Sequence, residues 1–299
     1  MNASKTFQRF LDFFLFTNIF LAASVTSLVF ETSYLLTVKI SDWSYPAFLF
    51  SATLFLYCFH RIYPFRKEES RSPLAIRHLW IKKNFSLFYL ILIASALCTI
   101  YLLIFSIPFR VVVSLLPIAF ISLGYTIPFI PWKGKWIRFR DIPGIKIFLI
   151  SLVLSLTTVL LPVMAFSRLT SLIDPPFLFI FIRRFFFIFA ITIPFDIRDM
   201  DYDRKKGTST IPLILGTFRA KQLSFLALGL FVVATLTQYF WLQDISKAYL
   251  MALCISALVS GGVIRYADFK RRDYYYGFYL EGMMLLQSLL IIAGNKLLT

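Results

Sequence analysis

Long apolar stretches recur along this chain and constrain its fold more than any other feature. A helix that crosses the hydrocarbon core of a membrane needs about 20 mostly apolar residues. Nine stretches meet or approach this length: residues 11–30, 46–63, 85–107, 109–124, 145–166, 176–195, 220–241, 248–264 and 274–294. The sequence therefore predicts an all-α, polytopic membrane protein with nine transmembrane helices. The first stretch lacks a small-residue cleavage site, so we expect it to be retained as a helix.

The composition supports this class of protein and excludes an ordinary soluble domain. Apolar residues make up 59% of the chain, the mean hydropathy is +0.77 and 35 residues are Phe. Soluble globular proteins are about 45–50% apolar. We expect residues 1–299 to form a single transmembrane domain.

The basic residues are distributed unevenly between the two ends of the predicted helices. Of 31 Lys and Arg residues, 24 lie in the N-terminal segment or in loops near residues 61–84, 125–146, 196–219 and 265–273, whereas five lie on the opposite side. By the positive-inside rule these four loops and the N-terminus are cytoplasmic, and the C-terminus is on the other side. This asymmetry explains the net charge of +16 without a nucleic-acid partner.

An acidic cluster follows the sixth apolar stretch, in the run FDIRDMDYDRKKGTSTIP that begins at Phe195. On a helix, Asp196, Asp199 and Asp203 share one narrow face, here called the acidic stripe, and Asp201 points away. Carboxylates at close range repel one another, and the C-terminal end of a helix disfavours anions. A divalent cation removes both penalties, and clustered oxygen ligands suit Mg²⁺. The alternative is a solvated loop in which the basic residues of DRKKG neutralise the acids.

The longer run DIRDMDYDRKKGTSTIPLILG resembles the second aspartate-rich motif of the UbiA superfamily of intramembrane prenyltransferases. That motif reads close to DxxDxxxDxxxGxxTxP, followed by LG. The chain matches it at Asp196, Asp199, Asp203, Gly207, Thr210, Pro212, Leu215 and Gly216. The family's nine helices and cytoplasm-facing active site agree with the predicted spans and topology, so the resemblance extends over the whole chain.

The resemblance implies both an architecture and a reaction. Nine helices surround a central cavity that opens toward the cytoplasmic side. Mg²⁺ held by the acidic stripe binds an isoprenyl diphosphate, the diphosphate leaves, and the allylic carbon alkylates a lipophilic acceptor, for which an aromatic compound is the first expectation. The implied partners are these two substrates and membrane lipid.

The first aspartate-rich motif of the family, close to NDxxDxxxD, is degenerate in this chain. The corresponding run is YCFHRIYPFRKEESRSP. Anchored on Pro73, the Asn position holds His60, and the three Asp positions hold Arg61, Pro64 and Glu68. Arg61, together with His60, is a candidate for binding diphosphate oxygens directly, because Arg forks match such oxygens in a bidentate way. The alternative is interfacial anchoring of a helix end.

Further candidates lie near the same end of the predicted bundle. Arg198, Lys133 and Lys146 are candidates for diphosphate binding, with an ordinary basic cytoplasmic loop as the alternative. Family members carry a Tyr followed by Lys after the fourth span; here Tyr125 fits, but the lysines come later. Tyr125, Asn18 and the surviving Glu68 are candidates for lining the cavity and contacting the acceptor. For Asn18, a hydrogen bond between packed helices is an equal alternative.

Other charged residues are expected to be structural. Arg183 and Arg184 lie within the sixth stretch, too far along the helix to reach the acidic stripe. They either extend outward to the interface or pair inside the bundle with a residue such as Glu281. Asp268 and Asp273 flank the last loop and either cover the site or belong to a solvated loop.

Three classes of function compete. The favoured one is a Mg²⁺-dependent prenyltransferase. A catalytically inactive relative that binds isoprenoid lipid or a partner is supported by the degenerate first motif. A secondary transporter is disfavoured, because the ionisable residues gather at one end and not at the midplane.

Overall fold

The computed structural model describes residues 3–65, 76–132, 134–167, 174–268, 271 and 273–296. Helices dominate this part of the chain. Their bounds are α1 (Ala3–Phe16), α2 (Ile19–Leu35), α3 (Ser44–Phe65), α4 (Ile76–Lys83), α5 (Phe85–Phe105), α6 (Phe109–Gly124), α7 (Ile145–Ser155), α8 (Leu161–Phe166), α9 (Pro175–Lys206), α10 (Ile211–Thr237), α11 (Lys247–Arg265) and α12 (Glu281–Lys296). Short π-helical segments join or extend some of them: η2 (Leu156–Leu160), η4 (Gln238–Leu242) and η5 (Tyr275–Leu280).

The helices confirm an all-α, polytopic membrane fold. Six continuous helical segments within the described residues are long and apolar enough to cross a membrane: α5, α7 through α8, most of α9, α10 with η4, α11, and η5 with α12. The bent pair α1–α2 makes a seventh, and α6 is a shorter apolar helix. Every predicted apolar stretch falls on helical structure. The number of nine membrane spans stays a prediction.

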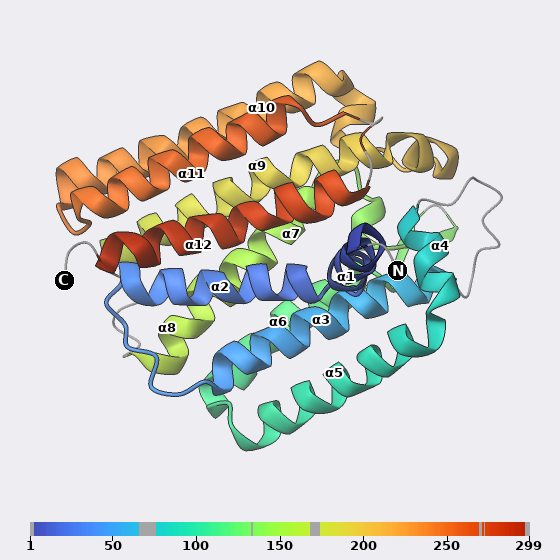
Figure 1. Cartoon of the computed structure of the whole chain (residues 1–299), viewed down its shortest axis with the longest axis horizontal. Helices are drawn as coiled ribbons and strands as arrows, with labels where there is room; N and C mark the ends of the chain where they lie inside the picture. Colours follow the sequence, from blue (N-terminus) through green and yellow to red (C-terminus); the bar gives the residue numbers. More distant parts are fainter. Residues whose placement is uncertain are drawn as a thin grey trace.

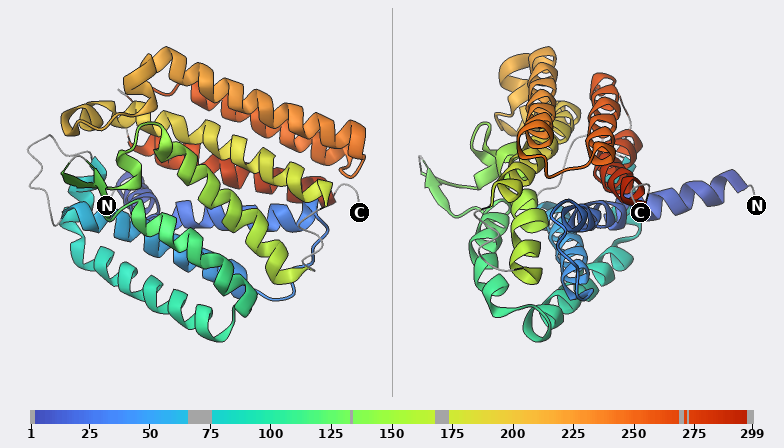
Figure 2. Two further views of the ribbon diagram at one scale, coloured as in Figure 1. Left: turned by 180° about the vertical axis from the view of Figure 1, so that it is seen from behind. Right: turned by 90° about the vertical axis from the view of Figure 1, so that its left-hand side faces the viewer.

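The first predicted span, residues 11–30, is split in the structure. α1 ends at Phe16, and Asn18 adopts a left-handed conformation with φ 66°. The two helices meet at a bend of 59°. Phe7 and Phe10 on α1 are 64% and 58% exposed, and α1 projects from the bundle (Figure 2). α1 is therefore a separate helix, and the continuous apolar span begins at Ile19.

The long helices run side by side across the molecule (Figure 1). α9 packs along α10, α12 along α2, and α3 along α5. α5 lies at one edge and buries just Phe88 and Ser95 of its 21 residues, while α10 and α11 form the opposite edge (Figures 1 and 2). α4 and the C-terminal end of α9 lie at the same end of the bundle, here called the site end.

A small hairpin follows α6 at the site end. Its strands are β1 (Ile130–Trp132) and β2 (Lys135–Ile137), and they pair antiparallel. The chain turns back over α6 just before the hairpin, so that a Cβ on Gly124 would lie 2.2 Å from the Phe129 ring. Any larger residue at position 124 would therefore displace the Phe129 and Phe139 rings where α6 ends and the hairpin begins.

Two arginines are buried in the N-terminal half of α9, away from the site end. Arg184 Nη2 pairs with Glu31 Oε1 of α2 at 3.1 Å, and both side chains are 1% exposed. Arg183 Nη1 donates a hydrogen bond of 2.8 Å to Gln238 Oε1 in η4. Neither arginine extends to the surface, so the alternative of pairing inside the bundle is the one observed. The carboxylate is Glu31 on a neighbouring helix, and Glu281, named as an example of such a partner, is not in this pair. Their predicted structural role agrees with these contacts.

Candidate functional site

The acidic stripe lies on a continuous helix, as its spacing predicts. α9 runs through all three aspartates and ends at Lys206, where Gly207, with a φ of 70°, forms the usual left-handed helix cap. Asp196 and Asp203 are 1% and 2% exposed, and Asp199 is partly buried, whereas Asp201 faces solvent. The helix therefore presents three carboxylates inward at the site end of the bundle and is not a solvated loop.

Lys146 connects two carboxylates of the stripe. It belongs to the first turn of α7, and its Nζ lies 2.5 Å from Asp196 Oδ1 and 3.9 Å from Asp203 Oδ2. Asp203 Oδ2 is buried and accepts no hydrogen bond from any described residue. The ammonium group of Lys146 thus shows that the space between these two carboxylates accepts a cation.

Arg198 holds the third carboxylate of the stripe. Its Nε and Nη2 donate to the two oxygens of Asp199 at 2.7 and 3.0 Å, which makes a bidentate fork. The guanidinium also lies 5.2 Å from the ring centroid of Phe195 and 5.1 Å from that of Tyr276. These contacts fix the guanidinium between two aromatic faces and beside the stripe.

Arg77 and Asp273 join the site from two other segments. Arg77, on α4, has Nη2 3.8 Å from Asp199 Oδ1 and Nε 3.8 Å from Asp273 Oδ1. Arg198 Nη1 lies 3.9 Å from the same Asp273 oxygen. Burial lowers the pKa of Arg77, and the charge of Arg198 lowers it further, while Asp199 and Asp273 oppose the change. Two arginines thus share two carboxylates at the site end.

The degenerate first motif contributes Arg61 and His60 from the end of α3. Arg61 Nη1 donates a hydrogen bond of 2.9 Å to the Phe16 carbonyl at the end of α1. The His60 ring centroid lies 5.3 Å from that of Tyr125, and His60 Nε2 is buried without a hydrogen-bond partner among the described residues. Arg140 covers the same tyrosine, with its guanidinium 5.2 Å from the Tyr125 ring centroid.

Arg140 links this aromatic group to the acidic stripe. Burial, the largest influence, lowers the pKa of Arg140, but Tyr125, Asp203 and Asp141 together outweigh burial and raise it. Arg140 therefore carries a firmly positive charge on the side of the site that Lys146 also occupies.

Glu281 lies opposite, at the start of α12. Its strongest electrostatic partners are Arg61, Arg198 and Arg77. The sequence analysis offered Glu281 as one example of a partner for the distant Arg183 and Arg184. One feature of the sequence could have placed Glu281 in the site. It lies two helical turns inside the last predicted span, near the loop that holds Asp273, and therefore at about the same membrane depth as the acidic stripe.

Three sequence candidates are not part of this group of contacts. Asn18 Nδ2 donates to Cys58 Sγ at 3.7 Å, and its Oδ1 is buried without a partner among the described residues. This contact joins the junction of α1 and α2 to α3. It matches the alternative given for Asn18, a hydrogen bond between packed helices. Glu68 and Lys133 lie outside the described residues.

The site is balanced in charge and densely paired. Five cationic side chains and five carboxylates of the described residues gather there: Arg61, Arg77, Arg140, Lys146 and Arg198, with Asp196, Asp199, Asp203, Asp273 and Glu281. Sequence reasoning named six of these ten as site residues and offered Asp273 as a residue that covers the site or belongs to a solvated loop. It weighed Arg140 as an ordinary basic loop residue that could still reach the diphosphate, and it did not assign Arg77 or Glu281 to the site.

A divalent cation fits the donor chemistry of the stripe but finds no complete protein cage. Over the described ranges, no three Asp, Glu, His or Cys side chains converge on one point as metal ligands. Asp196 and Asp203 nevertheless share one cation, Lys146, and Asp203 Oδ2 has no hydrogen-bond donor. Mg²⁺ is commonly held by one or two carboxylates with substrate phosphates and water completing its shell. These two aspartates match that requirement.

Comparisons with known proteins give a match to a protein family and to solved structures of the same fold. The UbiA prenyltransferase family profile matches residues 66–281. A UbiA homologue from Archaeoglobus fulgidus bound to GPP and Mg²⁺ superposes with a TM-score of 0.65 at 14% identity, over 94% of this chain and 98% of that one. The apo UbiA homologue from Aeropyrum pernix K1 gives 0.64 at 14% identity, over 92% and 97%. No curated protein sequence matches the chain.

Proposed function

The chain belongs to the UbiA prenyltransferase family, and from this premise we propose that it transfers a polyprenyl group from an isoprenyl diphosphate to a lipophilic acceptor within the membrane. An aromatic acceptor is the first class to test. The solved homologue bound to GPP and Mg²⁺ supports the donor class, and the ten charged side chains at the site end support a diphosphate-binding role for this region.

We assign Mg²⁺ to the acidic stripe, with Asp196 and Asp203 as its carboxylate ligands and Asp199 beside them. The buried, hydrogen-bond-free Asp203 Oδ2 and the shared Lys146 ammonium support this assignment. When bound, Mg²⁺ offsets the negative charge of the diphosphate and so helps it to leave.

The diphosphate oxygens are assigned to the arginines that replace the first motif. Arg61, Arg77 and Arg198 are guanidinium donors around Glu281, and each fork can bind two oxygens. The first motif holds His60, Arg61 and Pro64 where the family carries Asn and Asp, so positive side chains take over part of the neutralisation that carboxylate-bound metal would supply. Lys146 and Arg140 are further cations on the opposite side of the stripe.

The reaction follows from these assignments. The bond between the allylic carbon and the diphosphate oxygen breaks, and the diphosphate leaves with the electron pair toward Arg61, Arg77 and Arg198. The acceptor then forms a bond to the allylic carbon and gives up a proton. Tyr125, beside His60 and under Arg140, is assigned to the wall that orients the acceptor.

The proposed orientation places the site end in the cytoplasm. Twenty-four of the 31 Lys and Arg residues lie in segments assigned to that side, so the positive-inside rule supports a cytoplasmic N-terminus and a C-terminus on the other side. A water-soluble diphosphate head then reaches the arginines from the cytoplasm while its prenyl chain stays in the membrane.

The observation that carries the proposal is the inward-facing acidic stripe with its paired cations. Its test is release of pyrophosphate from geranylgeranyl or farnesyl diphosphate by the purified protein, with and without Mg²⁺, over a panel of lipophilic acceptors. We expect Mg²⁺-dependent release that Asp199→Asn lowers at least 100-fold, and that the solvent-facing Asp201→Asn leaves within about twofold. Metal-dependent binding without turnover would instead support the inactive, lipid-binding relative.

A further inference from the structure

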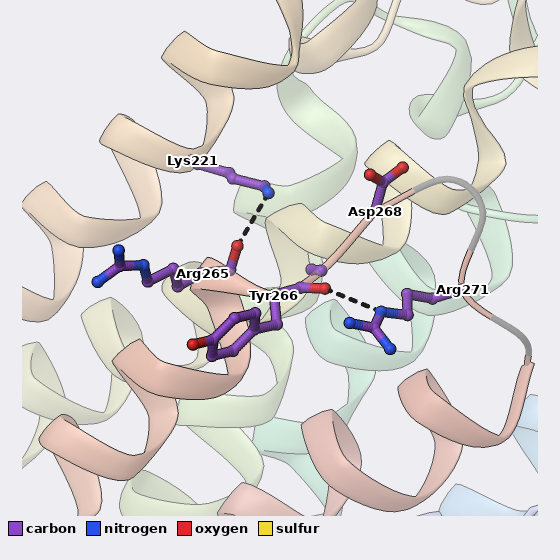
Figure 3. Close-up of a pocket in the computed structure, with 6 residues that line it drawn as sticks. Lys221, Arg265, Tyr266, Asp268 and Arg271 are labelled. Atoms are coloured by element: carbon purple, nitrogen blue, oxygen red, sulfur yellow. Dashed lines mark hydrogen bonds between the residues drawn. The ribbon is translucent and has the colours of Figure 1, made fainter.

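A pocket of about 410 Å³ opens between α10 and the connection from α11 to α12, outside the group of ten charged residues described above. Its lining residues come from α10, about three turns from its start, and from the end of α11 and the loop that follows (Figure 3). They are Lys221, Arg265, Tyr266, Ala267, Asp268 and Arg271. This set is called the basic pocket below.

Backbone carbonyls hold two of the basic side chains in place. Lys221 Nζ donates a hydrogen bond of 3.0 Å to the Arg265 carbonyl at the end of α11. Arg271 Nε donates one of 3.3 Å to the Tyr266 carbonyl, and its guanidinium lies 5.3 Å from the Tyr275 ring centroid. Both hydrogen bonds use neutral acceptors (Figure 3), so they position positive charge without cancelling it.

The lining carries an excess of positive charge. Three of its six members are basic and one, Asp268, is acidic. Three cationic groups around a space of this size match a phosphate, because ammonium and guanidinium groups form charge-assisted hydrogen bonds to phosphate oxygens.

The surroundings of the basic pocket are apolar. α10 and α11 form one edge of the bundle (Figures 1 and 2). Along them Leu226 is 60% exposed and Leu258 is 76% exposed, and Tyr266 at the rim is 62% exposed. In a membrane protein such exposed apolar side chains face acyl chains, and an exposed Tyr is typical of the headgroup level. The pocket therefore lies where the lipid-facing surface meets the charged end.

We propose that the basic pocket binds the phosphate headgroup of an anionic phospholipid from the surrounding bilayer. The cations bind the phosphate, and the acyl chains follow the apolar side chains of α10 and α11. A free phosphate compound would use the same cations but would gain nothing from Leu226 and Leu258. Anionic lipid headgroups are attracted by about 1 kcal/mol for each nearby Lys or Arg.

The test is direct lipid binding to the purified full-length protein. Phosphatidylglycerol or phosphatidylcholine is titrated into the detergent-solubilised protein, and bound lipid is counted by native mass spectrometry. We expect phosphatidylglycerol to bind in preference to phosphatidylcholine, and the double variant Lys221→Gln/Arg271→Gln to weaken phosphatidylglycerol binding roughly 30-fold. Gln at position 221 keeps a donor for the Arg265 carbonyl.

The matched control is Arg219→Gln/Lys205→Gln, which removes two exposed positive charges at the same end that do not line the pocket. This control should bind like the wild type. If the first double variant melts early in phosphatidylcholine, Arg265→Gln serves in its place, because its side chain makes no hydrogen bond or ion pair among the described contacts. Equal binding of the two lipids, unchanged binding in the pocket variants, or displacement of the lipid by glycerol phosphate at equal concentration would overturn the proposal.

Discussion

Lys146 Nζ lies 2.5 Å from Asp196 Oδ1, so a side chain of α7 neutralises a buried carboxylate of α9 at the place proposed for the metal. The same ammonium lies 3.9 Å from Asp203 Oδ2. Either a lysine or a divalent cation can balance these two carboxylates, and the exchange between them is open to test.

The variant Lys146→Met tests whether Mg²⁺ can take the place of the Lys146 ammonium group. With the ammonium removed, Asp196 and Asp203 lose the salt-bridge partner that they share among the described residues, and Arg140 remains as a more distant positive charge. We therefore expect a loss of about 3 kcal/mol in the free energy of unfolding when EDTA is present. Mg²⁺ should recover a large part of this loss. The measurement is thermal unfolding of the purified variant in EDTA and in Mg²⁺.

Lys205→Met is the control for that experiment, because Lys205 is exposed and forms no ion pair with the stripe in the part of the chain that the structure describes. Its stability should be the same with and without Mg²⁺. If Mg²⁺ stabilises Lys146→Met no more than it stabilises the wild type, Asp196 and Asp203 are not the metal ligands.

Arg77→Gln tests the diphosphate-binding arginines. Arg77 lies 3.8 Å from both Asp199 and Asp273, and a charge-assisted hydrogen bond contributes about 1.5–3 kcal/mol. We expect kcat/KM for the prenyl diphosphate to fall roughly 10- to 100-fold, mainly through KM, because the guanidinium binds the same phosphate oxygens before and during the reaction.

The control for Arg77→Gln is Lys82→Gln, on the exposed side of the same short helix. Steady-state kinetics with varied diphosphate and saturating acceptor measure both variants. A loss confined to kcat, with KM unchanged, would contradict a diphosphate-binding role for Arg77.

The acidic stripe was predictable because its information is local. The spacing of Asp196, Asp199 and Asp203 fixes their shared face once the segment is helical, and α9 is helical through the motif. The apolar stretches likewise predict helices from composition alone. The break at Asn18 was harder, because one polar residue within an apolar run does not distinguish a left-handed break from a packed hydrogen bond.

The partners of the stripe were not predictable from local patterns. Arg77, Asp273 and Glu281 come from three separate segments, and each reads on its own as an ordinary loop or span residue. Only the packing of α4, α9 and α12 at one end brings them together. The pairing of Arg184 with Glu31 was missed for the same reason, since the choice between two intramembrane glutamates depends on which helices are neighbours.

Glu31→Gln tests that buried pair. Arg184 and Glu31 are each 1% exposed, so neutralising the carboxylate leaves an arginine charge buried. We expect a loss of about 3–5 kcal/mol in the free energy of unfolding. Arg184→Met alone should cost a similar amount, whereas Glu31→Gln with Arg184→Met should cost less than the sum of the single changes. Chemical unfolding of all the variants in one detergent measures this double-mutant cycle; additive losses would show that the two charges are independent.

A fourth prediction concerns how pH changes the stability of the turn at residues 138–142, which follows the hairpin. Burial alone would raise the pKa of Asp141, but hydrogen bonds from Arg138 outweigh it and hold the pKa below its ordinary value. Arg138 Nε and Nη2 donate at 2.9 and 2.8 Å. Because the folded pKa is below the unfolded one, the ionised carboxylate stabilises the turn above the unfolded pKa of about 4, and this stabilisation is lost as the pH falls through the folded pKa.

Asp141→Asn should therefore loosen the turn at pH 7 by up to about 1 kcal/mol and remove the acid dependence of its local stability. Hydrogen exchange at residues 138–142, corrected for the intrinsic pH dependence, measures this. In the wild type, protection should fall as the pH drops below the unfolded pKa of about 4 and through the lower folded pKa, and in Asp141→Asn it should be low throughout. Asp201→Asn is the control, since Asp201 is exposed and lies on a different helix. Wild-type protection that stays constant through this acid range would show that the Arg138 contacts do not stabilise the turn.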